Sequence, residues 1–96
     1  MNYRPKPLDL EDVGLPEGLV SLQEAIAKNV HETWAYKRMQ EGWRYGETYD
    51  GENKRHPDLI PYEELSEGEK DYDRATAMNT LKLIQKLGYK IIKDEE

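Results

Sequence analysis

Ring-bearing and cationic side chains recur at helical spacing in two parts of this chain. His31, Trp34 and Arg38 are three and four residues apart, so on a helix their imidazole, indole and guanidinium groups project from one face. Lys70 and Arg74 are four residues apart, on a stripe of a second helix that should be buried. Aromatic rings can stack on a planar base while cations hold a phosphate. The pattern therefore predicts a pocket for a nucleotide-like or anionic small molecule.

The candidate site extends over two helices and the loop between them. Its ligand-binding candidates are the side chains that can stack on a base or supply positive charge: Trp34, Arg38, Trp43, Tyr45, Tyr62, Lys70 and Arg74. In the alternative interpretation the cations bond loop carbonyls, Asp50 or Asp73, and the rings form the core of a small domain. Both interpretations require an ordered loop.

Other chemistries find less support in the sequence. The chain has no cysteine and only two histidines, and the residue four positions after His31 is Ala35, which breaks the H-E-x-x-H metal spacing. We expect His31 to pack on its helix face and His56 to bond the loop backbone. No nucleophile elbow or phosphate-binding glycine loop is present, so we expect no enzyme, no metal and no cofactor.

The elements that must position these residues are mainly helical. The 96 residues allow one small domain. Apolar residues at spacings of three and four predict a helix over about 19–41, closed by Gly42, and Ser66 with Glu69 forms a capping box that predicts a second over about 67–87. We therefore predict two antiparallel helices that clasp a long ordered loop.

The remaining segments are predicted from proline, glycine and charge. Residues 1–18 are proline-rich and should form an extended arm, residues 19–92 the folded domain, and residues 93–96 a frayed acidic tail. Tyr89, Ile91 and Ile92 form a short strand or pack in an extended conformation.

Net charge limits the classes of partner. The formal net charge is -6 and the isoelectric point is near 5.0, which disfavours binding to a nucleic acid polymer or to a membrane surface. No apolar run approaches the roughly 18 residues of a membrane span, and the first residues lack the apolar core of a signal peptide. The sequence predicts a cytoplasmic location.

Several ordered motifs resemble the ryanodine receptor domain (RyR domain) family. The resemblance runs from about Leu19 to Ile91 through NVHETWAYKRMQEGWRYG, Asp50, KRHPDLIPYEELSEGEKDYDR and LKLIQKLGY. It implies a helix, structured loop and helix, in a single repeat of the bacterial or phage type. The resemblance also implies a non-enzymatic ligand-sensing or protein-interaction module.

A homodimer without a ligand is the alternative function. The larger relatives carry paired repeats, which two copies of this chain would imitate. On the second helix, the side opposite the buried stripe is also rather apolar, with Tyr72, Thr76, Leu83 and Leu87. A helix that is apolar on two sides needs cover from the arm or from a second copy.

Overall fold

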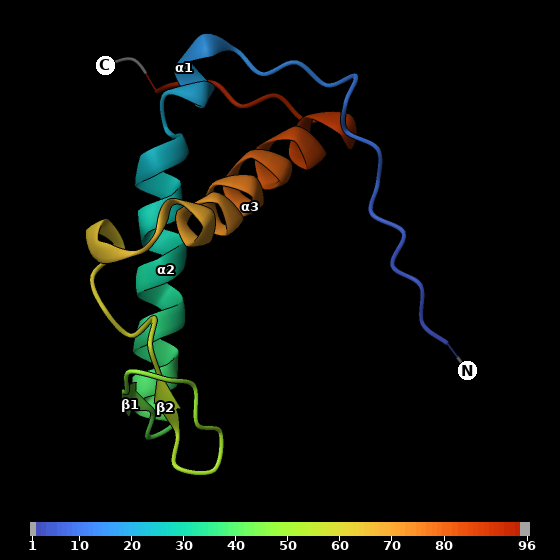
Figure 1. The fold of residues 1–96 in the computed structure, drawn as a ribbon. Coiled ribbons are helices and arrows are strands. Elements are labelled where there is room, and N and C mark those ends of the chain that lie inside the picture. The colour runs from blue at the N-terminus through green and yellow to red at the C-terminus, as the bar shows by residue number, and fades with distance from the viewer. Residues whose placement is uncertain (1, 95–96) are drawn as a thin grey trace.

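Two long helices and the connector between them form the body of the molecule (Figure 1). The computed structural model describes residues 2–94, and its elements follow in the order α1 (Glu17–Val20), α2 (Gln23–Gln40), β1 (Arg44–Tyr45), β2 (Arg55–His56), the short 3-10 helix η1 (Tyr62–Glu64) and α3 (Glu67–Lys86). The mainly helical class predicted from the sequence is confirmed. No helix of the described residues is long and apolar enough to cross a membrane.

The predicted start of the first helix at residue 19 is wrong, because a turn at Ser21 and Leu22 separates α1 from α2. The Ser21 hydroxyl donates a hydrogen bond to the Gly18 carbonyl at 2.7 Å, and the Leu22 amide donates to the Leu19 carbonyl at 3.1 Å. A serine side chain competes in this way with the regular helical ladder. The helix that carries the site residues therefore begins at Gln23.

The other helix ends agree closely with the prediction. Gly42 has a φ of 97°, and the Trp43 amide reaches back to the Arg38 carbonyl at 3.0 Å, which closes α2 in a Schellman motif. At the start of α3 the Ser66 hydroxyl accepts a hydrogen bond from the Glu69 amide at 3.2 Å, as the capping box predicts.

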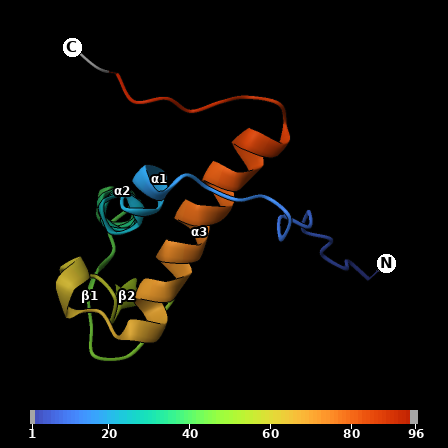
Figure 2. The same cartoon turned by 90° about the horizontal axis from the view of Figure 1, so that it is seen from above.

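The helices meet where their side chains are smallest. Ala27 on α2 and Ala77 on α3 are fully covered, which allows close approach of the two helices. In the view down α2, α3 extends across the picture, so the helices cross (Figure 2). Tyr62 and Leu65 from the connector pack with Ala27 to form the core cluster. The antiparallel clasp stays a prediction.

The connector is folded onto α2. Strands β1 and β2 pair in parallel, with Arg44 opposite Arg55 and Tyr45 opposite His56, and the intervening residues turn through a hydrogen bond between the Asn53 amide group and Asp50 at 2.8 Å. Its two largest anchors, Trp43 and Tyr62, are buried. This part of the chain can therefore hold side chains in fixed positions over α2.

The segments at both ends have no helix or strand beyond α1 and α3 within residues 2–94. The arm is attached to the end of α3: Lys86 Nζ donates to the Asp9 carbonyl at 3.0 Å and Gln85 to the Gly14 carbonyl at 2.9 Å. Residues 89–94 form no strand, and the side chains of Tyr89 and Ile92 are exposed. Of the predicted tail, residues 95–96 lie outside the described part.

Candidate functional site

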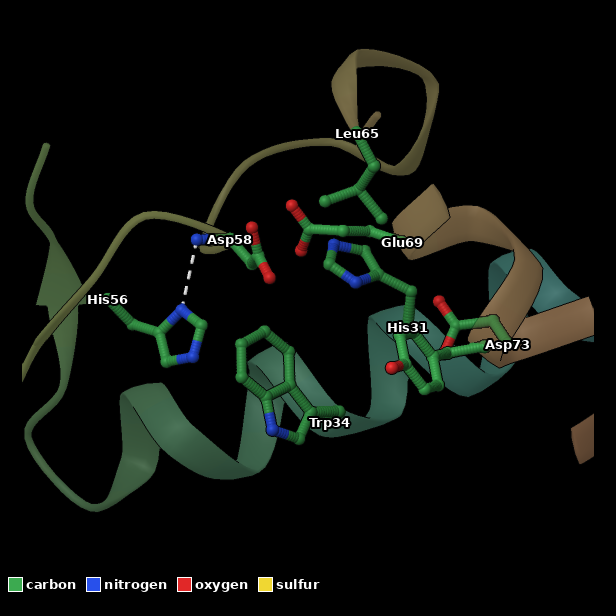
Figure 3. Close-up of a pocket in the computed structure, with 8 residues that line it drawn as sticks. His31, Trp34, His56, Asp58, Leu65, Glu69 and Asp73 are labelled. Carbon is green, nitrogen blue, oxygen red and sulfur yellow. Dashed lines mark hydrogen bonds between the residues drawn. The ribbon is translucent and has the colours of Figure 1, made fainter. Parts of the chain in front are cut away.

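A cavity of about 200 Å³ opens between α2, the connector and the first turns of α3 (Figure 3). We call it the acidic pocket. It is lined by His31, Trp34, His56, Asp58, Leu65, Glu69, Tyr72 and Asp73. Each of the three structural parts contributes: α2 supplies His31 and Trp34, the connector His56, Asp58 and Leu65, and α3 the rest. The pocket therefore exists only when the connector is folded.

His31 joins the connector to α2 at one side of the pocket. Its side chain is only 4% exposed, and its Nε2 lies 2.7 Å from the carbonyl oxygen of Ile60. Because a carbonyl can only accept, Nε2 carries the hydrogen and donates it. The expectation that His31 packs on the helix face is confirmed, and this hydrogen bond in addition fixes the connector above it.

Trp34 and His56 form the aromatic wall. Their ring centroids are 4.9 Å apart with an interplanar angle of 76°, an edge-to-face contact. His56 Nδ1 accepts a hydrogen bond from the Asp58 amide at 3.0 Å, the dashed line in Figure 3, so the prediction that His56 bonds the loop backbone is confirmed. The same hydrogen bond holds the backbone of Asp58 beside the pocket.

Three carboxylates, those of Asp58, Glu69 and Asp73, give the pocket its charge. A hydrogen bond with Asp58, together with burial and the negative charge of Asp58, raises the pKa of Glu69. Burial raises the pKa of Asp73, and the nearby charge of Asp58 adds to this effect, while the charge of His31 opposes it. No lysine or arginine of residues 2–94 forms an ion pair with these carboxylates. The pocket therefore holds negative charge without a matched cation.

The opposite arrangement occurs at the Arg74 cluster, formed by Glu24, Tyr62, Glu67, Asp71 and Arg74. Arg74 Nε donates to a Glu24 oxygen at 2.8 Å and Arg74 Nη1 to Asp71 at 2.8 Å, and the Tyr62 hydroxyl donates to Glu24 at 3.0 Å. The hydrogen bonds from Arg74 are the main reason why the pKa of Glu24 is lowered to about 2. The same contacts raise the pKa of Arg74.

The other two predicted cations also have carboxylate partners. Lys70 lies 3.3 Å from Glu67 and 5.6 Å from the centre of the Tyr62 ring. Arg38 lies 3.8 Å from Glu41, and its guanidinium carbon is 5.1 Å from the centre of the Trp43 ring. These cations thus contact carboxylates of the helices and rings of the connector, and not Asp50 or Asp73 as the structural alternative supposed.

The structure divides the predicted site residues between separate places. Arg38 and Trp43 lie together near the end of α2, whereas Tyr62, Lys70 and Arg74 meet at the start of α3. Tyr45 is 53% exposed. Of the predicted residues only Trp34 lines the acidic pocket.

The sequence reasoning missed the other polar residues of the acidic pocket as ligand-binding groups. It assigned Glu69 to a helix cap and His56 to the loop backbone, and both roles are present. A usable signal was the spacing of Glu69 and Asp73, which at four residues apart share one face of α3. The spacing alone does not predict that Asp58 of the connector lies opposite the face of α3 that carries Glu69 and Asp73.

A sequence model of the RyR domain matches residues 3–93 of the 96 in the chain. The match covers both long helices, the connector and the whole acidic pocket. It also includes most of the arm, from Tyr3 onward.

Proposed function

This chain belongs to the RyR domain family, and from that premise we propose that it is a non-enzymatic interaction and regulatory module that recognises a cationic group in its acidic pocket. One observation carries the proposal. The carboxylates of Asp58, Glu69 and Asp73 face a cavity beside the Trp34 indole and have no lysine or arginine partner within residues 2–94. A positively charged ligand would supply what this arrangement lacks.

Two forces favour an ammonium or guanidinium group. Carboxylates attract a cation, and the attraction is strongest where water is partly excluded, as it is around Asp73. The indole of Trp34 adds a cation–π contact, which favours an organic cation with an apolar surface. Among residues 2–94, no three histidine or acidic side chains are placed to hold a metal ion.

The size of the pocket restricts the ligand further. Its volume of about 200 Å³ is below the roughly 300–1,000 Å³ typical of sites for whole drug-sized molecules. A single cationic side chain fits this space better than a complete nucleotide. The nucleotide-like ligand expected from the sequence would also need free cations, whereas Arg38, Lys70 and Arg74 each have a carboxylate partner.

The proposal is tested by titrating the protein with methylguanidinium and, separately, with inorganic phosphate and AMP, while amide and indole NMR signals are recorded. We expect saturable shifts with methylguanidinium at Trp34 and Asp73 and none with the anions. Affinity should increase as pH rises through the raised pKa values of Glu69 and Asp73, because only the ionised carboxylates attract the cation.

The matched variants are Asp73→Asn and Glu47→Gln. Asp73 lines the pocket, whereas Glu47 is exposed in the connector, and both changes remove one negative charge. Asp73→Asn should weaken methylguanidinium binding and Glu47→Gln should leave it unchanged. Equal effects of the two changes, or saturable binding of phosphate in place of methylguanidinium, would overturn the proposal.

A further inference from the structure

We infer that the cation received by the acidic pocket is Arg4 in the arm of a second copy of this chain. The inference rests on the proposed function, because it names the occupant of the same pocket. In the resulting dimer each copy inserts its arm into the pocket of the other, with Arg4 between the carboxylates and Lys6 at the rim. Four observations support it: the charge of the arm, its direction, the uncovered area of one copy and the rigidity of the segment.

The arm has the charge that the pocket lacks. Residues 2–8 contain Arg4 and Lys6 and no acidic residue, in a chain whose net charge is -6. Both side chains lie in exposed segments and have no ion pair within the described part of the chain. A basic segment and an acidic pocket in one sequence are complementary surfaces for two copies of it.

The arm leaves its own body instead of approaching its own pocket. The arm lies along the second half of α3, from the hydrogen bond between Lys86 and Asp9 back to Asn79 beside Pro7, whereas Glu69 of the pocket lies near the start of the same helix. At a rise of about 1.5 Å per residue, Asn79 and Glu69 are roughly 15 Å apart. Figures 1 and 2 show residues before the attachment running outward, away from the helices. This direction favours exchange with a second copy.

One copy alone leaves an unusual amount of surface uncovered. Its accessible surface is 7893 Å², whereas a compact monomer of 11.3 kDa exposes about 5,700 Å². Its radius of gyration is 16.5 Å, against about 12.5 Å for a compact domain of this length. The excess of roughly 2,200 Å² per copy includes the exposed arm and C-terminal segment. Two copies together have about 4,400 Å² of it, within the total area that stable homodimers bury. The uncovered surface includes Tyr72 at the pocket, which is 79% exposed, and Tyr3 beside Arg4, which is 86% exposed.

The arm is also stiff enough to insert at low entropic cost. Pro5 and Pro7 flank Lys6 and restrict the backbone to extended conformations, so less freedom is lost on binding. The planar guanidinium of Arg4 can pair with carboxylates and stack on the Trp34 ring at once, which a lysine ammonium does less well. Two such contacts, related by a two-fold axis, give a closed dimer.

The inference is tested by sedimentation velocity on the full chain over a range of concentrations. We expect a monomer–dimer equilibrium in the unmodified chain and a shift to monomer in the double variant Arg4→Glu, Lys6→Glu. The matched control is Lys90→Glu, Lys93→Glu, which changes the net charge equally at exposed positions of the C-terminal segment. The control should retain the dimer.

A mixing experiment then tests the exchange itself. The arm variant keeps an intact pocket, and the Asp73→Asn variant keeps an intact arm. Each variant alone should form a weaker homodimer, because no arm–pocket contact in it is intact. In a mixed dimer, the arm of the Asp73→Asn copy meets the intact pocket of the arm variant. We expect more dimer in the mixture than in either variant alone, and methylguanidinium should dissociate it. A synthetic peptide NYRPKPLD should bind the arm variant, with shifts at Trp34.

The outcomes separate the two proposals. A chain that is monomeric at all concentrations, or a dimer that the arm variant does not weaken, overturns the arm exchange, while methylguanidinium binding in the same sample upholds the pocket. The NMR signals of Trp34 can also differ between the unmodified chain and the arm variant by the same amount at every protein concentration. That result would mean that the arm binds the pocket of its own copy, and it would also overturn the exchange. Absence of methylguanidinium and peptide binding overturns both proposals.

Discussion

The Arg74 cluster and the acidic pocket lie on the same two helices and contain the same kinds of acid, but their electrostatics are opposite. In the Arg74 cluster, hydrogen bonds from Arg74 lower the pKa of Glu24 to about 2. In the acidic pocket, the pKa values of Glu69 and Asp73 are raised. The acids of the first group are paired with cations of the chain, and those of the second have no lysine or arginine partner within residues 2–94.

This difference distinguishes acids that stabilise the fold from acids that we propose to bind a cation. An acid whose charge is paired in the folded state stabilises that state, whereas an acid confined near other acids destabilises it when ionised. The cations predicted to bind a ligand, Arg38, Lys70 and Arg74, are all paired with carboxylates of the chain. The carboxylates of the acidic pocket have no lysine or arginine partner within residues 2–94, which is why the pocket is assigned to a cation.

Loss of the Trp43 indole should destabilise the chain more than any of the other substitutions proposed, and it should act on the connector side of the acidic pocket. Trp43 is 9% exposed and contacts the rings of Tyr49 and His56, with centroid distances of 5.8 and 6.3 Å. Trp43→Ala should cost about 3–5 kcal/mol of unfolding free energy. We expect the connector residues of the acidic pocket, His56 and Asp58, to become mobile while the Glu24–Arg74 contact persists. Thermal denaturation would measure the loss of stability, and NMR of the folded variant would measure the mobility.

The control is Tyr45→Ala, at a residue of the same connector that is 53% exposed. Its effect should stay within about 0.5 kcal/mol, as for most surface substitutions. Equal stability losses in the two variants would mean that Trp43 is no anchor of the connector. Loss of the Glu24–Arg74 contact in Trp43→Ala would mean that the two regions form a single unit.

The next prediction concerns the stability that Glu24 contributes in the Arg74 cluster. Glu24→Gln removes the charged acceptor of Arg74 and of the Tyr62 hydroxyl, so we expect a lower melting temperature at neutral pH than in the unmodified chain. Because the pKa of Glu24 is lowered to about 2 from its ordinary 4.5, its contribution is present above pH 4.5 and is lost as pH falls through about 2. The difference between variant and unmodified chain should therefore disappear near pH 2.

The matched control for Glu24→Gln is Glu47→Gln, which removes the same charge from an exposed position of the connector. Its melting temperature should follow that of the unmodified chain at each pH. A decrease in the melting temperature of Glu24→Gln that is the same at pH 7 and pH 2 would show that the glutamine disturbs packing. It would mean that the charge of Glu24 does not stabilise the fold.

The helix boundaries could be predicted from the sequence because their causes are local. Ser66 with Glu69 starts α3, and Gly42 ends α2, through contacts within a few residues along the chain. The break between α1 and α2 at Ser21 also has a local cause, but residues 19–41 contain no glycine or proline that would indicate it. The sequence also predicted an ordered connector, and the burial of Trp43 and Tyr62 agrees with this.

The acidic pocket could not be predicted in the same way, because it depends on contacts between distant segments. The pKa of Glu69 is raised by Asp58, which the connector brings to the start of α3, and the position of the connector depends on the bond from His31 to Ile60. Likewise Arg74 and Glu24 are fifty residues apart. Local patterns identify the charges, whereas only the tertiary arrangement decides which of them are paired.

Removal of the Asp73 charge should have a small effect on stability, and its sign should be opposite to that of Glu24→Gln. Asp73→Asn should stabilise the chain at pH 7 by about 0.5–1 kcal/mol, in the lower part of the range for single stabilising substitutions. The reason is that burial and Asp58 raise the pKa of Asp73 above its ordinary 3.8, so the ionised form is disfavoured in the folded state. Denaturant unfolding at several pH values measures the effect.

The pH dependence follows from the same shift. With a raised pKa, the favourable contribution of the neutral carboxyl is complete below pH 3.8 and is lost as pH rises through the folded-state pKa. The gain in stability from Asp73→Asn should therefore be absent in acid and should develop as pH rises. Destabilisation by asparagine at pH 7 would mean that Asp73 is paired, with His31 as the nearest candidate. In that case the acids of the pocket, like those of the Arg74 cluster, would be paired within the chain, and the pocket would need no cation from a partner.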